Sequence, residues 1–292
     1  MSATPVSLEP RAGSVASELR PVPGPSAIAG GTRRFFTLLW VMAVTEFKLT
    51  FHGTSLGYAW SLVRPLLTFG VLLAVFTQVF HFGESVKDYP ALLLLNVMLF
   101  TLFAEATQRA VTSVVAREQI VRKAQFPRLV IPLSIVLTAV LDLSLNLVVV
   151  FIFLVAYGVD PTWTWLLLPV IVLGLLVVTV AVSMIVSALY PRFRDMLLIW
   201  SVLSTVLFYA TPVLYPIGAA PEQFRHLIQL NPLTPIFEQA QKWIIDPAAP
   251  GAVGATEGAE YFLAASFAVI VILCAAAVWV FKREAPRIAE EL

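Results

Sequence analysis

Charged residues are scarce in this chain. Asp, Glu, Lys and Arg make up only 13% of its 292 residues, whereas hydrophobic residues make up 59%. Soluble domains carry roughly 25% charged residues, so too few polar side chains remain here to cover a water-facing surface. The composition therefore excludes a soluble globular protein and indicates one that crosses a membrane several times.

Three further scarcities narrow the function. Cys274 is the only cysteine, which excludes a disulfide framework and a cysteine-based metal site. The histidines lie far apart in a pattern that matches no metal-binding motif, so no metal site is expected. No lysine follows a glycine, so the glycine-rich loop that cradles nucleotide phosphates is missing and no cofactor is expected on this chain. The formal net charge of +1 does not point to a nucleic-acid partner, and none is expected.

The apolar residues gather in six long stretches, each of which predicts a transmembrane helix. A seventh run, residues 35–44, is too short to cross ~30 Å of hydrocarbon. Arg33 and Arg34 precede it and Lys48 follows, which predicts an amphipathic helix over residues 33–50 that lies in the membrane interface. The arginine pair also resembles a twin-arginine export signal, but no clean cleavage site follows. The predicted spans are 65–82, 91–108, 129–157, 163–189, 196–215 and 261–281.

The positive charges predict how these spans are oriented. With the N-terminus inside, sixteen of the nineteen lysines and arginines fall on the inner side of the membrane. The sequence thus predicts an all-α, multi-pass protein of the cytoplasmic membrane, surrounded by membrane lipids, with both termini in the cytoplasm. Residues 1–32, rich in Pro, Gly, Ser and Ala, are expected to form a disordered tail, and residues 284–292 a second cytoplasmic tail.

Two connections are too long for plain turns. Residues 216–260 contain two amphipathic segments, 222–230 and 233–245, around a proline-rich break, which predicts a re-entrant helical hairpin on the outer side. Residues 109–128 are basic and lie on the inner side. They form either a short helix that contacts a cytoplasmic partner or a solvated loop that only fixes the orientation of the chain.

Polar and aromatic side chains inside the spans suggest a path for a substrate. A carboxylate at mid-membrane costs about 2.5–3.5 kcal/mol to insert, so Glu105 and Asp142 are expected to face protein or water. They line a polar path or make interhelical hydrogen bonds, and Glu105 has the further option of reaching the inner headgroups. Aromatic rings stack on sugars but also pack helices together. The candidate pathway residues are Tyr58, Trp60, Arg64, Glu105, Trp200, Phe208 and Tyr209.

Four stretches, in order along the chain, resemble one known family. Residues 56–66 read LGYAWSLVRPL, residues 122–134 read RKAQFPRLVIPLS, and residues 190–195 read YPRFRD. The fourth stretch combines TPVLYP at 211–216 with NPLTPIFE at 231–238. Together with the predicted topology, they resemble the permease subunit of ABC-2 polysaccharide exporters, which include O-antigen, capsule and teichoic-acid exporters. The resemblance covers about residues 33–283.

The resemblance implies the ABC-2, or type V, exporter fold and a homodimer of permeases joined to two cytoplasmic ATPase subunits that bind ATP and Mg. It implies a lipid-linked polysaccharide as cargo. The proline- and alanine-rich tail resembles the actinobacterial branch, whose cargo is a cell-wall galactan. Alternatives are an ABC-2 exporter of drugs or lipids, a secondary transporter, and a membrane-embedded enzyme, although no catalytic cluster supports the last.

The resemblance also assigns roles to three groups of residues, none of them catalytic. Residues of the interfacial gate helix would be Arg33, Arg34, Phe35, Phe36 and Trp40. Residues that couple the chain to the ATPase would be Arg117, Glu118, Gln119, Arg122, Lys123 and Phe126. Residues of the outer hairpin would be Asn231, Pro232, Pro235 and Glu238.

Overall fold

The protein is represented by a computed structural model that describes residues 31–51, 57, 59–79, 81, 86–118, 127–254 and 260–284. Over these residues the chain is built from helices and connecting turns and contains no strand, which confirms the predicted all-α class. The structure of residues 1–30 and 285–292, which make up most of the two predicted tails, lies outside the described part of the chain.

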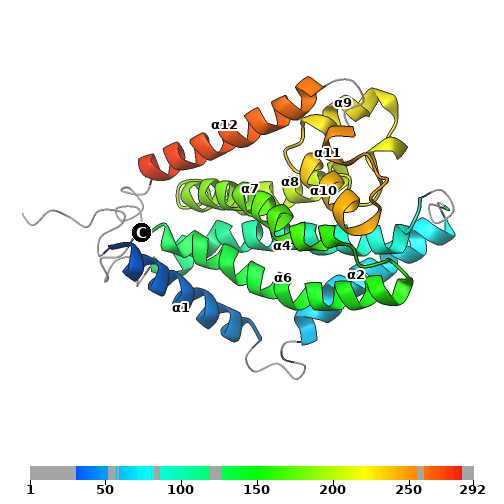
Figure 1. Ribbon diagram of the computed structural model, residues 1–292. Helices are drawn as coiled ribbons and strands as arrows, with labels where there is room; N and C mark the ends of the chain where they lie inside the picture. Colours follow the sequence, from blue (N-terminus) through cyan, green and yellow to red (C-terminus); the bar gives the residue numbers. More distant parts are fainter. Residues whose placement is uncertain are drawn as a thin grey trace, which may run out of the picture.

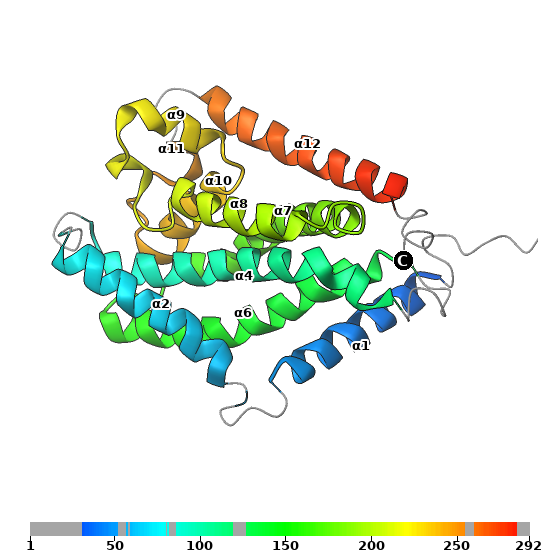
Figure 2. The ribbon, with the colours of Figure 1, turned by 180° about the vertical axis from the view of Figure 1, so that it is seen from behind.

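Helix α4 (Tyr89–Ala116) forms the centre of the bundle. It packs against α6 (Val130–Tyr157) and α7 (Leu168–Leu189), and α2 (Ala59–Gln78) crosses its outer side (Figures 1 and 2). Residues 91–100, ALLLLNVMLF, are apolar around the whole helix apart from Asn96, and all of them are buried. An apolar helix surface can face lipid as well as protein, so what favours the central position of α4 is its polar side chains, Asn96, Glu105 and Arg109, which are costly to expose to lipid.

The remaining long helices lie around this centre. Helix α12 (Glu260–Glu284) packs against α7, and α1 (Gly31–Phe51) lies obliquely against α6. Helix α8 (Met196–Ala210) follows α7 and contacts α4. The start of α1 and the end of α12 lie at the same end of the bundle, and the short helices α9 to α11 lie at the opposite end (Figure 1).

The described residues contain five helices that are long and apolar enough to cross a membrane: 59–78, 89–116, 130–157, 163–189 and 261–284. The fifth predicted span, 196–215, is helical only over the 15 residues of α8. Its helix ends before Pro212, because proline lacks the N–H that would continue the hydrogen-bond ladder. Asn96 Nδ2 donates to the Pro212 carbonyl (3.1 Å) and the Tyr89 hydroxyl to the Leu214 carbonyl (2.8 Å), so side chains of α4 satisfy the non-helical backbone.

Two other predicted boundaries differ from the structure. The span predicted over 91–108 continues as helix to Ala116, so residues 109–116 are not part of a loop. The span predicted to start at Pro65 begins at Ala59, and Pro65 lies buried inside α2. Proline removes one backbone hydrogen bond without necessarily ending a helix that other helices support.

We call residues 217–254 the outer cap. It contains the 3₁₀ turn η2 (Ile217–Ala219), α9 (Glu222–Leu230), α10 (Thr234–Ala240), the π-helical turn η3 (Gln241–Ile245) and α11 (Gly251–Gly254). The two predicted segments are therefore helical, with a break between them. Trp165 in the 3₁₀ turn η1 (Trp163–Leu167) donates through Nε1 to the Ile244 carbonyl at 2.9 Å, which fixes the cap to the start of α7. Insertion of the hairpin into the outer leaflet stays a prediction.

Candidate functional site: a charged cavity between α2, α4 and α6

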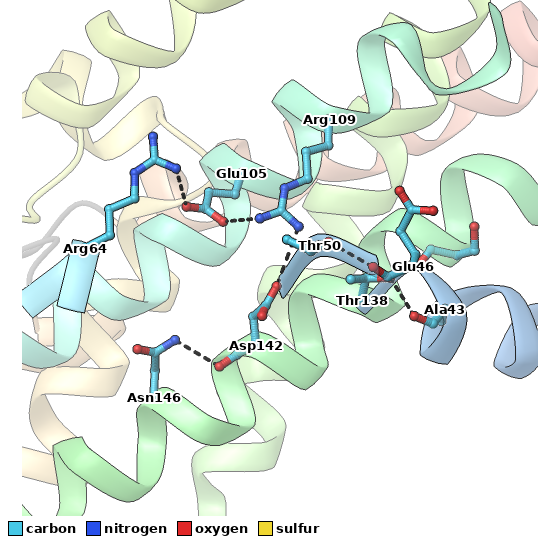
Figure 3. Close-up of polar contacts among 10 residues, drawn as sticks. Ala43, Glu46, Thr50, Arg64, Glu105, Arg109, Thr138, Asp142 and Asn146 are labelled. Carbon is cyan, nitrogen blue, oxygen red and sulfur yellow. Dashed lines mark hydrogen bonds and ion pairs between the residues drawn. The ribbon is translucent and has the colours of Figure 1, made fainter. Parts of the chain in front are cut away.

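A cavity of about 280 Å³ opens where α1, α2, α4 and α6 meet. Thr50 from the end of α1 and Trp60 from the start of α2 line one side. Glu105 and Arg109 from α4, together with Asp142 from α6, line the other (Figure 3). Ionisable side chains from three helices thus meet inside an otherwise apolar bundle.

These ionisable groups form a chain of ion pairs across the three helices. Arg64 Nη1 lies 3.6 Å from Glu105 Oε1, and Arg109 Nη2 lies 2.9 Å from Glu105 Oε2. Arg109 Nη1 in turn lies 3.6 Å from Asp142 Oδ2. Asn146 donates through Nδ2 to the backbone carbonyl of Asp142 at 2.9 Å (Figure 3). The two guanidinium groups balance the two carboxylates, so the cluster is neutral as a whole.

Helical spacing explains part of this cluster. Glu105 and Arg109 are four residues apart on α4 and so share one face of that helix. Asp142 comes from α6 and is only 8% exposed. Neither of its carboxylate oxygens makes a hydrogen bond within the described residues, so Arg109 is its main compensation. A buried charge that lacks such a partner is strongly destabilising.

A second cavity, of about 300 Å³, adjoins the first. Arg64, Glu105, Pro65 and Thr101 line both, so the two spaces meet at the Arg64–Glu105 pair. The second cavity extends to α8, where its lining includes Ser204, Thr205, Phe208 and Tyr209.

The structure brings together five of the seven candidate pathway residues. Trp60, Arg64 and Glu105 line the first cavity, and Arg64, Glu105, Phe208 and Tyr209 line the second. Trp200 is instead buried, and its ring lies edge-on to Phe103 with centroids 6.2 Å apart, which fits helix packing. Tyr58 lies outside the described residues.

Arg109 is the site residue that the sequence analysis missed. The sequence analysis placed it in the inner loop because the predicted span ended at residue 108. Its spacing of four residues from Glu105 was the signal that would have extended the helix and placed both side chains on one face. Asp142 was expected to face protein or water, but its partner Arg109 on α4 was not predicted.

The gate-helix residues occupy the outward face of α1. Arg33, Arg34, Phe36 and Trp40 are exposed, and Phe35 is half-buried. The opposite face packs on α6, where Thr138 donates through Oγ1 to the Ala43 carbonyl at 3.1 Å. Helix α1 is therefore attached to the bundle along one side and presents basic and aromatic residues on the other. Whether this face lies in a membrane interface stays a prediction.

The proposed coupling residues are only partly described. Arg117, at the end of α4, has a side chain only 14% exposed and lies 2.5 Å from Glu46 Oε2 on α1. Arg117 thus joins α1 to α4 instead of facing a solvent-exposed partner surface. Glu118 is half-buried, whereas Gln119, Arg122, Lys123 and Phe126 lie outside the described residues.

Two of the four outer-hairpin residues, Asn231 and Glu238, make hydrogen bonds that hold the outer cap together. Asn231 donates through Nδ2 to Thr211 Oγ1 at 2.8 Å and accepts from the Leu233 backbone N–H at 3.0 Å, so it fastens the break between α9 and α10 to the end of α8. Pro232 is half-buried beside it, and Pro235 lies in the first turn of α10. Glu238 is almost fully buried and accepts from the Ile217 backbone N–H at 3.0 Å.

The stability of the outer cap is expected to depend on pH through Glu238. Burial raises the pKa of its carboxyl from 4.5 to about 7, and the hydrogen bond from Ile217 offsets this only in part. The folded cap therefore binds a proton more tightly than the unfolded chain does. Its stability is highest below about pH 4.5 and falls, by about 3 kcal/mol at most, as the pH rises to about 7.

Glu238→Gln, which does not ionise, is expected to remove this loss. The measurement is backbone hydrogen exchange over residues 217–245, corrected for the intrinsic effect of pH. The matched control is Glu222→Gln, a change at an exposed position of α9 that should keep the pH dependence of the wild type. Equal pH dependence in wild type and Glu238→Gln would contradict the assignment.

Comparison with known proteins identifies the family. The sequence model of the ABC-2 type transporter family matches residues 37–244, which include the two cavities, α7, α8 and most of the outer cap. The chain belongs to the ABC-2 type transporter family. All the residues that line the charged cavity lie within the stretch that the family model matches.

Three similar proteins are named for O-antigen export or polysialic acid transport. The O-antigen export system permease protein RfbA of Myxococcus xanthus is 29% identical over 257 residues, which cover 87% of this chain and 95% of that protein. RfbA of Klebsiella pneumoniae is 34% identical over 200 residues, 68% of this chain and 76% of that protein. The polysialic acid transport protein KpsM of Escherichia coli is 22% identical over 245 residues, 82% of this chain and 91% of that protein.

Proposed function

We propose that this ABC-2 protein is the membrane-spanning subunit of an ATP-driven exporter that moves a lipid-linked polysaccharide across the cytoplasmic membrane. Two copies would form the path, and two ATPase subunits would bind ATP and Mg on the cytoplasmic side. The relatives named for O-antigen export and for polysialic acid transport support the polymer class. The observation that carries the proposal is the pair of adjoining cavities, which run from Thr50 and Trp60 past Arg64 to the aromatic side chains of α8.

The mixed lining of these cavities suits such a cargo. Aromatic rings offer apolar faces to sugar rings, and Phe208 and Tyr209 stand beside the hydroxyl groups of Ser204 and Thr205. An exporter of an apolar drug or lipid needs no charged cluster beside these rings. Helix α2, which lines both cavities, is largely uncovered, because only 11% of its apolar stretch is buried within one chain. A second copy that covers α2 would complete the path.

We further propose six crossings with both termini in the cytoplasm. The start of α1 and the end of α12 share one end of the bundle (Figure 1). That end carries the basic residues Arg33, Arg34, Lys282 and Arg283. Helix α8 would span the membrane together with residues 211–217, whose backbone α4 helps to satisfy. The outer cap would then close the exit.

Reconstitution tests this function. The chain and the ATPase that copurifies with it from its own host are placed in proteoliposomes with a lipid-linked glycan extracted from that host. We expect transfer of the glycan that requires ATP, no ATP hydrolysis by the chain alone, and a complex with the mass of two permeases and two ATPases. ATP turnover by the purified chain, or transfer without the ATPase, would refute the proposal.

Site-specific labelling tests the orientation. The only native thiol is removed by Cys274→Ser, and single cysteines replace Gln223 in α9 or Lys282 in α12. A membrane-impermeant maleimide added to intact cells should label the first position and not the second. The reverse pattern would overturn the orientation while leaving the export function to the reconstitution.

A further inference from the structure

We propose that the cavity between α2, α4 and α6 binds a phosphate group, with Arg64 as its first ligand and Glu105 as the side chain that the phosphate displaces. The inference rests on the proposed function, because the phosphate would be the anionic group that joins lipid and glycan in the cargo. It goes beyond that function by naming the chemical group that is bound, the arginine that binds it and the carboxylate that competes with it.

Arg64 is the less engaged of the two arginines. Its guanidinium lies 3.6 Å from Glu105, beyond hydrogen-bond distance, and its side chain is 78% exposed. Arg109, in contrast, lies 2.9 Å from Glu105 and also faces Asp142. A guanidinium has five N–H donors in a planar fork that matches the oxygens of a phosphate. Arg64 therefore has donors to offer to an incoming anion, whereas Arg109 is held by the two carboxylates.

The surroundings of Arg64 suit a phosphate. Thr50, Ser61 and Thr101 make the lining of the same cavity polar, although Thr50 and Thr101 already donate their O–H groups to the backbone carbonyls of Glu46 and Val97. The cavity volume of about 280 Å³ leaves room for a phosphate and several waters, since one water occupies roughly 30 Å³ of liquid. Arg64 also lines the adjoining cavity, so a group bound there would stand at the boundary between the two.

Glu105 makes the site reversible. It lies between the two guanidinium groups, so an anion that approaches Arg64 replaces the carboxylate as its partner. Glu105 keeps its shorter pair with Arg109 in the process. Because the cluster is neutral before the anion arrives, binding is an exchange of partners rather than capture by unpaired positive charge. A transport path requires such a balance, since a group must bind well enough to enter and weakly enough to leave.

Equilibrium binding tests this proposal without any need for export. The probe is farnesyl diphosphate, titrated calorimetrically into the purified chain in phosphatidylcholine nanodiscs, with farnesol as the uncharged comparison. We expect the diphosphate to bind and farnesol to bind at least tenfold more weakly. Arg64→Gln should weaken diphosphate binding about tenfold or more, because the neutral amide loses the charge-assisted hydrogen bonds of the guanidinium group. Glu105→Gln should strengthen it severalfold, because the competing carboxylate is gone.

The opposite signs of these two changes distinguish a ligand site from a merely structural ion pair. A structural pair predicts that Arg64→Gln and Glu105→Gln act alike. The matched control is Lys87→Gln, because Lys87 is 70% exposed and lies 3.5 Å from Asp246 at the other end of α4, outside both cavities. It should leave binding unchanged. If Arg64→Gln does not fold, Arg64→Lys replaces it as the test variant. Because lysine keeps the positive charge, Arg64→Lys should weaken diphosphate binding less than tenfold.

Competition by inorganic diphosphate identifies the source of the phosphate. Displacement of the probe by inorganic diphosphate at similar concentrations supports a site for the anion alone, and much weaker displacement supports a lipid-attached phosphate. Equal binding of farnesol and farnesyl diphosphate, competition by glucuronate as strong as by diphosphate, or weaker binding in Glu105→Gln would overturn the proposal. Binding as expected in a protein that fails to export would refute the proposed function instead.

Discussion

Arg109→Leu is expected to destabilise the protein by about 3 kcal/mol and to abolish export, because it leaves the buried carboxylate of Asp142 without its partner. Leucine keeps the bulk of the stem and the helical propensity, so the loss reports the charge. The measurement is the denaturant midpoint and the heat-inactivation rate of the purified protein in detergent. About a third of the Arg109 side chain is exposed, so the expected loss of stability lies at the lower end of the about 3–5 kcal/mol typical for breaking a buried ion pair.

A second substitution isolates the cause of this loss. Asp142→Asn removes the uncompensated charge at nearly constant shape, so it should restore most of the stability of the Arg109→Leu variant. Arg109→Lys keeps the charge and should lose much less stability than Arg109→Leu. If Arg109→Leu is as stable as the wild type, or if Asp142→Asn destabilises it further, the ion pair does not stabilise the bundle in the way its geometry indicates.

Reversal of charge at Arg122 and Lys123 is expected to abolish association with the ATPase, and export with it, without affecting membrane insertion. The reason is that the resemblance places these residues in the helix that contacts the ATPase, and two reversals turn attraction to an acidic surface into repulsion. Copurification of the ATPase with the Arg122→Glu/Lys123→Glu variant gives the result directly. Protease protection of the membrane fraction shows whether the variant is inserted.

The control for this experiment carries the same change in charge at another basic pair that the sequence assigns to the inner side. Lys282→Glu/Arg283→Glu alters the end of α12, where both side chains are exposed. It should retain the ATPase. If both double variants lose the ATPase, the overall basic charge of the inner side holds it. If both retain the ATPase, residues 122 and 123 do not couple the two subunits.

The helical elements were largely predictable because the information for them is local. Long apolar stretches predicted the helices that became α2, α4, α6, α7 and α12. The amphipathic segments 222–230 and 233–245 were predicted as short helices and correspond to α9 and to α10 with η3. The errors lay at the ends of the helices. Helix α4 continues past the charged Arg109 to Ala116, although composition alone assigned Arg109 to a loop.

The candidate site was predictable only in pieces. Glu105 and Asp142 were recognisable as charges in apolar helices, because the cost of inserting them implies a polar neighbour. The identity of that neighbour was not available, since it depends on which faces of α4 and α6 meet. Trp200 shows the converse, because an aromatic residue in a span suits either a path or packing, and its buried ring beside Phe103 fits packing.

The sequence by itself determined that this protein is an α-helical membrane protein, because hydrophobicity and charge bias act over neighbouring residues, and its short motifs carried the resemblance to ABC-2 permeases. Only the tertiary structure decided that Arg64, Glu105, Arg109 and Asp142 form one neutral chain beside two adjoining cavities. The physical reason is that ion pairs between helices depend on the rotation and crossing of each helix. These are set by the packing of the whole bundle, and no single helix encodes them.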